Sequence, residues 1–363
     1  MIEARGLART FRKKKQAVVA VAGVDLDVAA GEVVGFLGPN GAGKTTTLRM
    51  LTTLLTPTAG TATVAGYDVV RESEQVRRSI GYVSQAGGVF SGARAGDEVM
   101  DHGMLYGLER AVVKERGQRL FEQMDLPGLW HRMPKHMSGG QKRRLDIVMG
   151  LINEPRLVFL DEPTTGLDPQ ARANLWEHIR DLRDRLGTTV FLTTHYLDEA
   201  DILSDRILII DQGRIVAADT ADNLKAQVSG DLVDLEVVDR AQVPEAARAL
   251  ATLSEGEVEV EDRHVRGRVR RAGRSVQGLI RDLDRSGIDL DSLEVHRPTL
   301  DDVFLTLTGR SLRDAEASAD ASGEGGGETG DEAGDPADAR TAEAASSMAA
   351  DRPETPTNEG ALR

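Results

Sequence analysis

The sequence lacks cysteine, long apolar runs and a recognisable signal peptide. Zero cysteines among 363 residues exclude disulfide bonds and thiolate metal sites, and are typical of a cytosolic protein. No stretch approaches the roughly eighteen uninterrupted apolar residues of a membrane-spanning helix, and the opening MIEARGLARTFRKKK lacks the apolar centre of a signal peptide. We therefore expect a cytoplasmic chain that neither crosses a membrane nor is exported.

The negative charge is concentrated at the C-terminal end. The chain carries 59 Asp and Glu against 45 Lys and Arg, a formal net charge of −14. Between Asp314 and Arg363 there are 13 acidic and 3 basic residues, which leaves 46 acidic and 42 basic residues elsewhere. The rest of the chain is thus nearly neutral. Because it offers no broad basic surface, we expect no nucleic-acid partner.

Residues 312–363 have a composition typical of disorder. They consist largely of alanine, glycine, serine, proline and acidic residues, with no aromatic residue. Such a segment buries too little apolar surface to offset the entropy that ordering would cost. We therefore expect a disordered acidic tail.

Residues 1–228 have the pattern of an α/β domain. The runs EVVGFLG (32–38), RLVFLDEP (156–163) and TTVFLTTH (188–195) are nearly continuous in apolar residues, as is typical of strands buried on both faces of a mainly parallel sheet. At about 87–150 apolar residues recur every three or four positions, which predicts a helical insertion. Because ligands lie beyond the carboxyl ends of such strands, the polar residues after these runs should converge on one site.

Residues 231–311 predict a second, smaller α+β domain. Four segments alternate apolar and polar residues like half-exposed strands, and helices are indicated around 244–252, 275–286 and 299–308. The order βαββαβ followed by a last helix resembles a ferredoxin-like fold.

The segment GPNGAGKT (38–45) follows a predicted buried strand and precedes a predicted helix. In that context the glycines let backbone N–H groups curl around a β-phosphate. Lys44 would bridge the β- and γ-phosphates, and Thr45 would offer its hydroxyl to Mg²⁺. The alternative is a flexible turn between strand and helix, which the strand context disfavours.

Two carboxylates follow the apolar run LVFL. Asp161 at the strand end can hold Mg²⁺, and Glu162 can polarise an attacking water. An Asp-Glu pair in this position is often only a solvated strand end. Beside a phosphate loop in the same sheet, however, a carboxylate is needed to manage the metal.

Further polar residues stand at the ends of predicted strands. Gln85 could reach Mg²⁺ or the attacking water, and His195 could hydrogen-bond a γ-phosphate. A lone histidine after a strand, such as His195, is more often a structural residue. A lone glutamine there, such as Gln85, is more often solvated. Asp168, in GLDP, is likewise expected at the end of a predicted strand. Phe11 could stack on adenine, or could be an ordinary core residue.

The segment MSGGQKRRLD (137–146) predicts a second phosphate seat. Ser138 is placed to cap a helix, and Gly139 and Gly140 leave the first backbone N–H groups open to an anion. The alternative is a capped surface helix without a ligand.

These motifs, in this order and spacing, resemble the ATPase subunit of an ABC transporter over residues 1–228. More closely, SGGQKRRLDI, LTTHYLDEADILSDRILIIDQGRIVA and PTLDDVFLTLTG resemble the daunorubicin/doxorubicin-resistance type of bacterial export ATPase. Met137 stands where leucine is usual, a volume-conserving change, and SGARAGDEVMDHG (91–103) departs from the usual stretch.

The resemblance implies a P-loop NTPase fold of the ABC type, with a mainly parallel core sheet, an antiparallel β part and a helical insertion. It implies catalytic roles for Glu162, His195 and Gln85, and Mg²⁺ ligation by Thr45, Gln85 and Asp161. The ATP-binding residues would be Phe11, Gly38, Pro39, Asn40, Gly41, Ala42, Gly43, Lys44, Thr45, Thr46, Ser138, Gly139, Gly140, Gln141 and Asp168.

The resemblance also implies the partners. Two copies would face head to tail, so that the signature segment 138–141 of one covers the ATP of the other. A separate integral-membrane permease would carry a hydrophobic drug, antibiotic or lipid-like compound, with this chain peripheral at the cytoplasmic face of the membrane. The alternative is a soluble ABC ATPase acting on ribosomes or nucleic acid. Such proteins usually have two cassettes or a long coiled coil, whereas this sequence has one phosphate loop and no sustained heptads.

Overall fold

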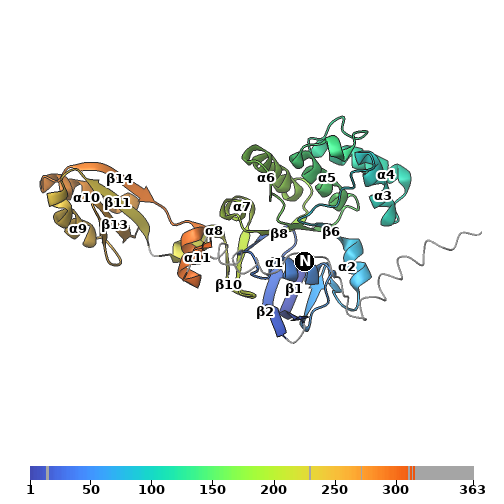
Figure 1. Ribbon diagram of the computed structural model, residues 1–363, viewed down its shortest axis with the longest axis horizontal. Coiled ribbons are helices and arrows are strands. Elements are labelled where there is room, and N and C mark those ends of the chain that lie inside the picture. The colour runs from blue at the N-terminus through green and yellow to red at the C-terminus, as the bar shows by residue number, and fades with distance from the viewer. Residues whose placement is uncertain (14–15, 229, 271, 310, 313, 315–363) are drawn as a thin grey trace, which may run out of the picture. The chain divides into compact units, whose positions relative to one another are not determined.

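A six-stranded sheet forms the centre of the first domain in the computed structural model, which describes residues 1–13, 16–228, 230–270, 272–309, 311–312 and 314. The strand order is β10-β9-β3-β8-β7-β6, with β10 antiparallel to β9 and all other neighbours parallel. The strands are β3 (Val33–Leu37), β6 (Ile80–Val83), β7 (Leu157–Asp161), β8 (Thr189–Thr194), β9 (Arg206–Asp211) and β10 (Arg214–Asp219). The three predicted buried strands are thus confirmed as β3, β8 and β7, which are consecutive in this sheet. Figure 1 labels β6, β8 and β10 of the same sheet.

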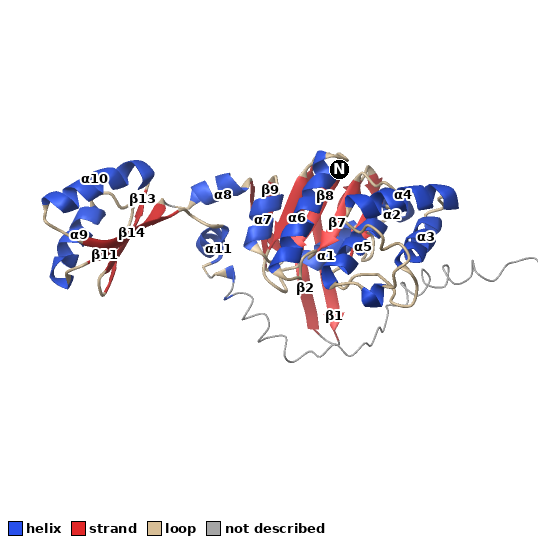
Figure 2. Ribbon diagram, turned by 90° about the horizontal axis from the view of Figure 1, so that it is seen from above, coloured by secondary structure: helices blue, strands red, loops and turns tan. Residues whose placement is uncertain are grey.

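A four-stranded antiparallel sheet packs with the first around helix α1 (Lys44–Leu51). Its order is β2-β1-β4-β5, and its strands are β1 (Ile2–Lys13), β2 (Gln16–Val28), β4 (Ala59–Val64) and β5 (Tyr67–Asp68), followed by α2 (Ser73–Ser79). Leu48 and Leu51 of α1 are buried between Phe36 and Phe159 of one sheet and Leu7 of the other. Burial of this apolar surface fixes α1, and with it the loop before it. Figure 2 shows the strands in red and α1 among the helices in blue.

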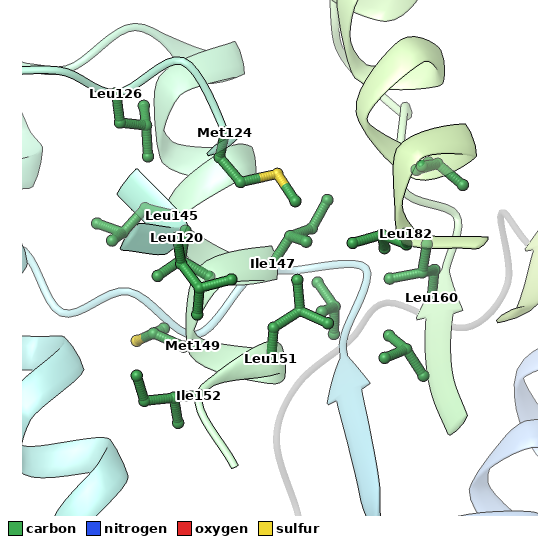
Figure 3. Packing of buried hydrophobic residues seen from close by; sticks show 14 of the residues in the cluster. Leu120, Met124, Leu126, Leu145, Ile147, Met149, Leu151, Ile152, Leu160 and Leu182 are labelled. Carbon is green, nitrogen blue, oxygen red and sulfur yellow. The ribbon is translucent and has the colours of Figure 1, made fainter. Parts of the chain in front are cut away.

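The helical insertion is confirmed, because segment 87–150 contains helices and no strand. Helices in and after it are α3 (Ala95–Leu105), α4 (Arg110–Gln123), η1 (Pro134–His136), α5 (Gly139–Leu151), α6 (Pro169–Asp184), α7 (Leu197–Leu203) and α8 (Ala221–Gln227). Figure 3 shows how α5 is held: Leu145 and Ile147 share one apolar cluster with Leu120 of α4, Leu160 of β7 and Leu182 of α6. Helix α5 is therefore packed against both the insertion and the central sheet.

The segment after α8 forms a third sheet, which is antiparallel and has the order β12-β13-β11-β14. Its elements are β11 (Asp231–Val237), η2 (Arg240–Gln242), α9 (Val243–Ala251), β12 (Glu259–Glu261), β13 (His264–Val269), α10 (Ala272–Arg285) and β14 (Leu290–His296). The inward positions of the strands are buried with residues of α9 and α10. The predicted order βαββαβ, which is that of ferredoxin-like folds, is observed.

The last helix corrects the expected domain boundary. We placed it with the second domain, but α11 (Leu300–Thr308) packs against α7 and α8 of the first. Val303 and Phe304 are buried there with Leu224, and so is Leu312, which we had assigned to the tail. An amphipathic helix packs wherever its apolar face finds a matching surface, and sequence order does not set that choice. Apart from Asp314, the remainder of the predicted tail lies outside the described residues.

The described residues include no helix that combines the length and the apolar character needed to cross a lipid bilayer.

Close packing of α5 on β6 gives a stability prediction. A Cβ added at Gly81 would lie 2.0 Å from the carbonyl oxygen of Gly150 in α5. Since backbone atoms cannot swing aside as side chains do, we expect Gly81→Ala to lower the free energy of unfolding by about 2–3 kcal/mol. In the control Gly278→Ala the new Cβ meets open space within a helix, and stability should rise by up to ~1 kcal/mol. Denaturant unfolding measures both, and an unchanged midpoint for Gly81→Ala would contradict this packing.

Candidate functional site

The segment after β3 forms a loop that ends at the first turn of α1. Gly43 precedes the helix with φ of 106°, and a Cβ there would lie 2.6 Å from the carbonyl oxygen of Ala20. Only glycine meets both demands without strain. Lys44 Nζ folds back over the loop and donates to the carbonyl oxygens of Gly38 at 2.7 Å and Pro39 at 3.1 Å. Backbone N–H groups at a helix start and one lysine thus surround the same space, the arrangement that binds phosphate.

A pocket of about 190 Å³ lies over this loop. Its lining combines residues of the loop and of α1 with Gln85 and Glu162, and consists of Ala20, Pro39, Asn40, Gly41, Gly43, Lys44, Thr45, Thr46, Gln85 and Glu162. The structure therefore brings most of the predicted phosphate-binding residues together with two predicted catalytic residues. Gly38 and Ala42 belong to the loop but do not line the pocket.

The carboxylate of Glu162 is the centre of the site. Its Oε2 accepts hydrogen bonds from Gln85 Nε2 at 2.9 Å and Thr165 Oγ1 at 3.1 Å, and its Oε1 lies 3.4 Å from Lys44 Nζ. His195 Nδ1 lies 3.2 Å from Oε2, within ion-pair distance, although this nitrogen makes no hydrogen bond to a described residue. Side chains from the phosphate loop and from the ends of β6, β7 and β8 thus meet at one buried carboxylate.

The neighbouring carboxylate, Asp161, faces the start of α1. Its Oδ1 accepts hydrogen bonds from Thr193 Oγ1 at 2.6 Å and Thr45 Oγ1 at 3.2 Å. Burial raises the pKa of Asp161, and the nearby negative charge of Glu162 raises it further. The oxygen atoms of Asp161 and Thr45 are of the type that hard divalent cations prefer, and a cation would relieve this crowding of negative charge. The residues present therefore fit a magnesium site.

The backbone turns sharply between these two carboxylates. Glu162 has φ of 43°, in the left-handed region that residues other than glycine rarely adopt. Its N–H donates to the carbonyl oxygen of Thr193 at 3.2 Å and to the Thr193 hydroxyl at 3.0 Å. Strain held by surrounding hydrogen bonds is common at functional sites. With the backbone turned in this way, the carboxylate of Glu162 lies beside Lys44 and that of Asp161 beside Thr45.

Phe11 and Asp168 do not line the pocket. Phe11 is 38% exposed on β1, with the guanidinium carbon of Arg9 4.9 Å from its ring centroid. Asp168 caps α6, because its Oδ1 accepts from the N–H of Ala171 at 2.9 Å.

The predicted second phosphate seat is a well-formed helix start. The Gln141 N–H donates to Ser138 Oγ at 3.2 Å, while the Ser138 N–H donates to Gln141 Oε1 at 3.0 Å. This reciprocal pair is a capping box, so the predicted cap is confirmed. Neither these residues nor Gly139 and Gly140 line the pocket over the phosphate loop. Within one chain, the predicted second seat is thus separate from the pocket over the phosphate loop.

Sequence reasoning missed Arg143 and Thr193. Arg143 is buried and its guanidinium donates to backbone carbonyl oxygens on both sides of the site, and Thr193 links Asp161 to the backbone of Glu162. A cation placed among the apolar positions of α5 was the available signal for Arg143. No comparable signal marked Thr193 within its strand.

The pKa of Glu162 gives a prediction for acid stability. Burial acts to raise this pKa, but His195, Lys44 and Thr165 together lower it from 4.5 to about 2. Because the folded value lies below the unfolded one, ionised Glu162 stabilises the fold above pH 4.5, by at most about 3 kcal/mol, and this is lost as the pH falls toward 2.

Glu162→Gln lacks this titration. We therefore expect the difference in unfolding free energy between the wild type and Glu162→Gln to stay constant from pH 7 to pH 5 and to shrink between pH 4.5 and pH 3. Denaturant titrations at fixed pH measure it. A difference that does not change down to pH 3 would contradict the depressed pKa.

Comparison with known proteins agrees with this site. A family model described as ABC transporter matches residues 21–165. The chain is 43% identical over 313 residues to the daunorubicin resistance ATP-binding protein DrrA3 of Streptomyces coeruleorubidus, which covers 86% of this chain and 97% of the relative. It is 41% identical over 315 residues to the daunorubicin/doxorubicin resistance ATP-binding protein DrrA of Streptomyces peucetius, with coverage of 86% and 94%.

A solved structure supports the fold. A dimeric ATP-binding cassette bound to ADP and phosphate superposes with a TM-score of 0.56 at 24% identity, over 61% of this chain and 98% of the other. The resemblance drawn from the motifs is confirmed by the extent of the matches to the curated relatives, which span nearly their whole length. The chain belongs to the ATP-binding subunits of ABC transporters, the ATPases that power transport, in the group of the daunorubicin and doxorubicin resistance proteins.

Proposed function

We propose that this ATPase drives export of a hydrophobic drug, antibiotic or lipid-like compound through a separate integral-membrane permease. The main support for ATP hydrolysis at this site is that Lys44, Gln85 and His195 all lie against the carboxylate of Glu162. This carboxylate lines the pocket over the phosphate loop. The drug-resistance relatives support the substrate class. They do not favour the alternative of a soluble ABC ATPase acting on ribosomes or nucleic acid.

Arrival of ATP would break the pair between Lys44 and Glu162. In the structure Lys44 is engaged with Glu162 and with the carbonyl oxygens of Gly38 and Pro39. Phosphate oxygens entering the loop compete for the same ammonium group. Once Lys44 turns to them, Glu162 loses a positive neighbour that lowers its pKa. The carboxylate becomes a stronger base and is free to orient the attacking water.

The remaining predicted residues complete the site. Asp161, Thr45 and Gln85 would hold Mg²⁺, which neutralises charge between the β- and γ-phosphates when bound. His195 would hydrogen-bond the γ-phosphate from the end of β8. Phe11 would stack on adenine, because its ring is exposed, although the Arg9 guanidinium covers part of it.

The segment Ser138–Gln141 would serve a second copy of the chain. These residues do not line the pocket of their own chain. A head-to-tail homodimer would place them, with Asp168 near the contact, over the ATP held by the partner. The partner's Lys44 would then supply the cation for that phosphate. This arrangement explains why one chain carries two phosphate seats.

The domain formed by residues 231–296 would be an accessory part for dimer contact or regulation. The chain would act as a peripheral protein at the cytoplasmic face of the membrane, where its permease partner lies.

Glu162→Gln tests the catalytic assignment. The amide keeps the shape of the side chain but cannot act as a base, so we expect MgATP binding close to that of the wild type and turnover lowered at least about 100-fold. ATP-bound dimer should accumulate. Glu154→Gln is the matched control, since Glu154 pairs with Arg116 and Arg119 at the surface. Turnover of Glu162→Gln equal to that of the control would assign the chemistry to another residue.

Mixed dimers test the composite site. Lys44→Ala removes the phosphate cation, and Gly139→Asp introduces a carboxylate where a γ-phosphate would approach, at a position where a new Cβ has room. Each homodimer is damaged in both sites. If segment 138–141 serves the neighbour, a mixed dimer of the two variants has one intact site and should trap one ATP.

The double variant paired with wild type reverses the expectation. It would carry one lesion in each composite site and should trap no ATP. Trapping is measured in the Glu162→Gln background, because coupled sites need not turn over singly. If the double variant with wild type traps ATP and the mixed single variants do not, the head-to-tail model is wrong.

A further inference from the structure

Helix α5 carries a buried cation directly behind its capped start. The Arg143 side chain is 7% exposed, and its guanidinium donates to four backbone carbonyl oxygens. The acceptors are Pro163 at 2.7 Å, Ser84 at 2.5 Å, Asp161 at 2.9 Å and Glu162 at 3.3 Å. One side chain thus holds the backbone of both catalytic carboxylates and the residue before Gln85.

One turn further along α5, a buried carboxylate holds the segment that follows Gln85. Asp146 is 8% exposed, and its Oδ1 accepts from the N–H groups of Gly88 at 2.8 Å and Val89 at 3.2 Å. Its charge also compensates that of Arg143, since each is among the charges that act on the pKa of the other. Arg143 and Asp146 together therefore fix both ends of segment 84–89.

The helix that carries these two residues is packed as a rigid body. Leu145 and Ile147 are fully buried and, with Leu151, belong to the apolar cluster shared by α4, β7 and α6 (Figure 3). Arg143 lies only two residues beyond Gln141 of the capping box. A displacement at the start of α5 therefore cannot be absorbed before it reaches Arg143. It must either strain four hydrogen bonds or move the backbone of Asp161–Pro163.

From these contacts we infer that Arg143 and Asp146 are positioning residues that couple the two ATP sites of the dimer. Contact between Ser138–Gln141 and the partner's ATP would set the position of α5, and Arg143 would transmit it to Glu162 and Gln85 of its own chain. Each site would then reach its hydrolytic geometry only when the other is filled. This inference rests on the proposed head-to-tail dimer.

A purely structural role would have different consequences. An arginine that only satisfies buried carbonyl oxygens would change stability when replaced, but it would leave the ATP dependence of the remaining activity as it was. Coupling predicts that the Hill coefficient for ATP falls together with the rate. The two roles are therefore separated by cooperativity.

Arg143→Lys with Arg144→Lys as its matched control is the first test. Both changes keep charge and helix propensity, but Arg144 forms an ion pair with Asp125 at 3.0 Å and contacts none of the catalytic backbone. For Arg143→Lys we expect MgATP binding by the separate protomers within about twofold of wild type. Turnover should fall about tenfold or more, because lysine cannot span four acceptors and Glu162 loses its position.

The Hill coefficient should fall from well above 1 in the wild type toward 1 in Arg143→Lys, and should not change in Arg144→Lys. Asp146→Asn, with Asp125→Asn as control, repeats the test without touching the carboxylate backbone. The asparagine oxygen can still accept the two N–H groups, so this variant should fold even if Arg143→Lys does not. Its Hill coefficient should also fall, because a neutral amide holds the two N–H groups less strongly than a carboxylate does and no longer compensates the charge of Arg143.

The outcomes separate this inference from the dimer on which it rests. If the wild type is cooperative and both Arg143→Lys and Asp146→Asn keep its rate and Hill coefficient, the coupling role is overturned. A wild-type Hill coefficient of 1 also overturns it, while trapping by the mixed single variants would still support the composite site. If instead the double variant with wild type traps ATP, the dimer model itself fails.

Discussion

The ion pair between Lys44 and Glu162 is the interaction on which the site depends. Lys44 is 4% exposed and Glu162 6% exposed, at 3.4 Å from each other, so both charges have been removed from water. Such pairs contribute little to stability after desolvation, and breaking one by removing a partner is costly. Their value here is that a polyphosphate can replace the carboxylate as the partner of lysine. The resting contact therefore holds Lys44 next to the carboxylate that we propose as the catalytic base, and each side chain would occupy the other until ATP arrives.

The order of strands in the central sheet makes this contact possible. Strands β3, β8, β7 and β6 are neighbours and parallel, so their carboxyl ends lie along one edge. The phosphate loop, His195, the carboxylate pair and Gln85 follow these four strands in that order across the sheet. Residues more than a hundred positions apart in the sequence thus meet at this edge of the sheet. Packing of α5 against the same sheet then brings Arg143 to the backbone behind them.

Features determined by local sequence could be predicted, and features determined by distant packing could not. The phosphate loop, the capping box at Ser138 and the buried strands each follow from a few consecutive residues. Helix α11 was also predicted, but its packing on α7 and α8 was not, because its apolar face carries no information about which surface it will cover. Likewise, the acceptors of Arg143 come from segments about 20 and 60 residues away, so its role appears only in the folded chain.

The two predicted phosphate seats differ in charge in a way that would make them complementary. A helix start supplies only about half a positive charge, and at Ser138 the capping box already uses the N–H of Gln141. The seat at residues 138–141 can therefore orient a γ-phosphate but cannot neutralise it. The loop at Gly38–Thr45 has the lysine, but the neighbouring carboxylate of Glu162 would repel the same phosphate once its pair with Lys44 is broken. In the proposed head-to-tail dimer each seat would supply what the other lacks. A filled site would then be favoured only where both meet, and binding of ATP would bring the two chains together.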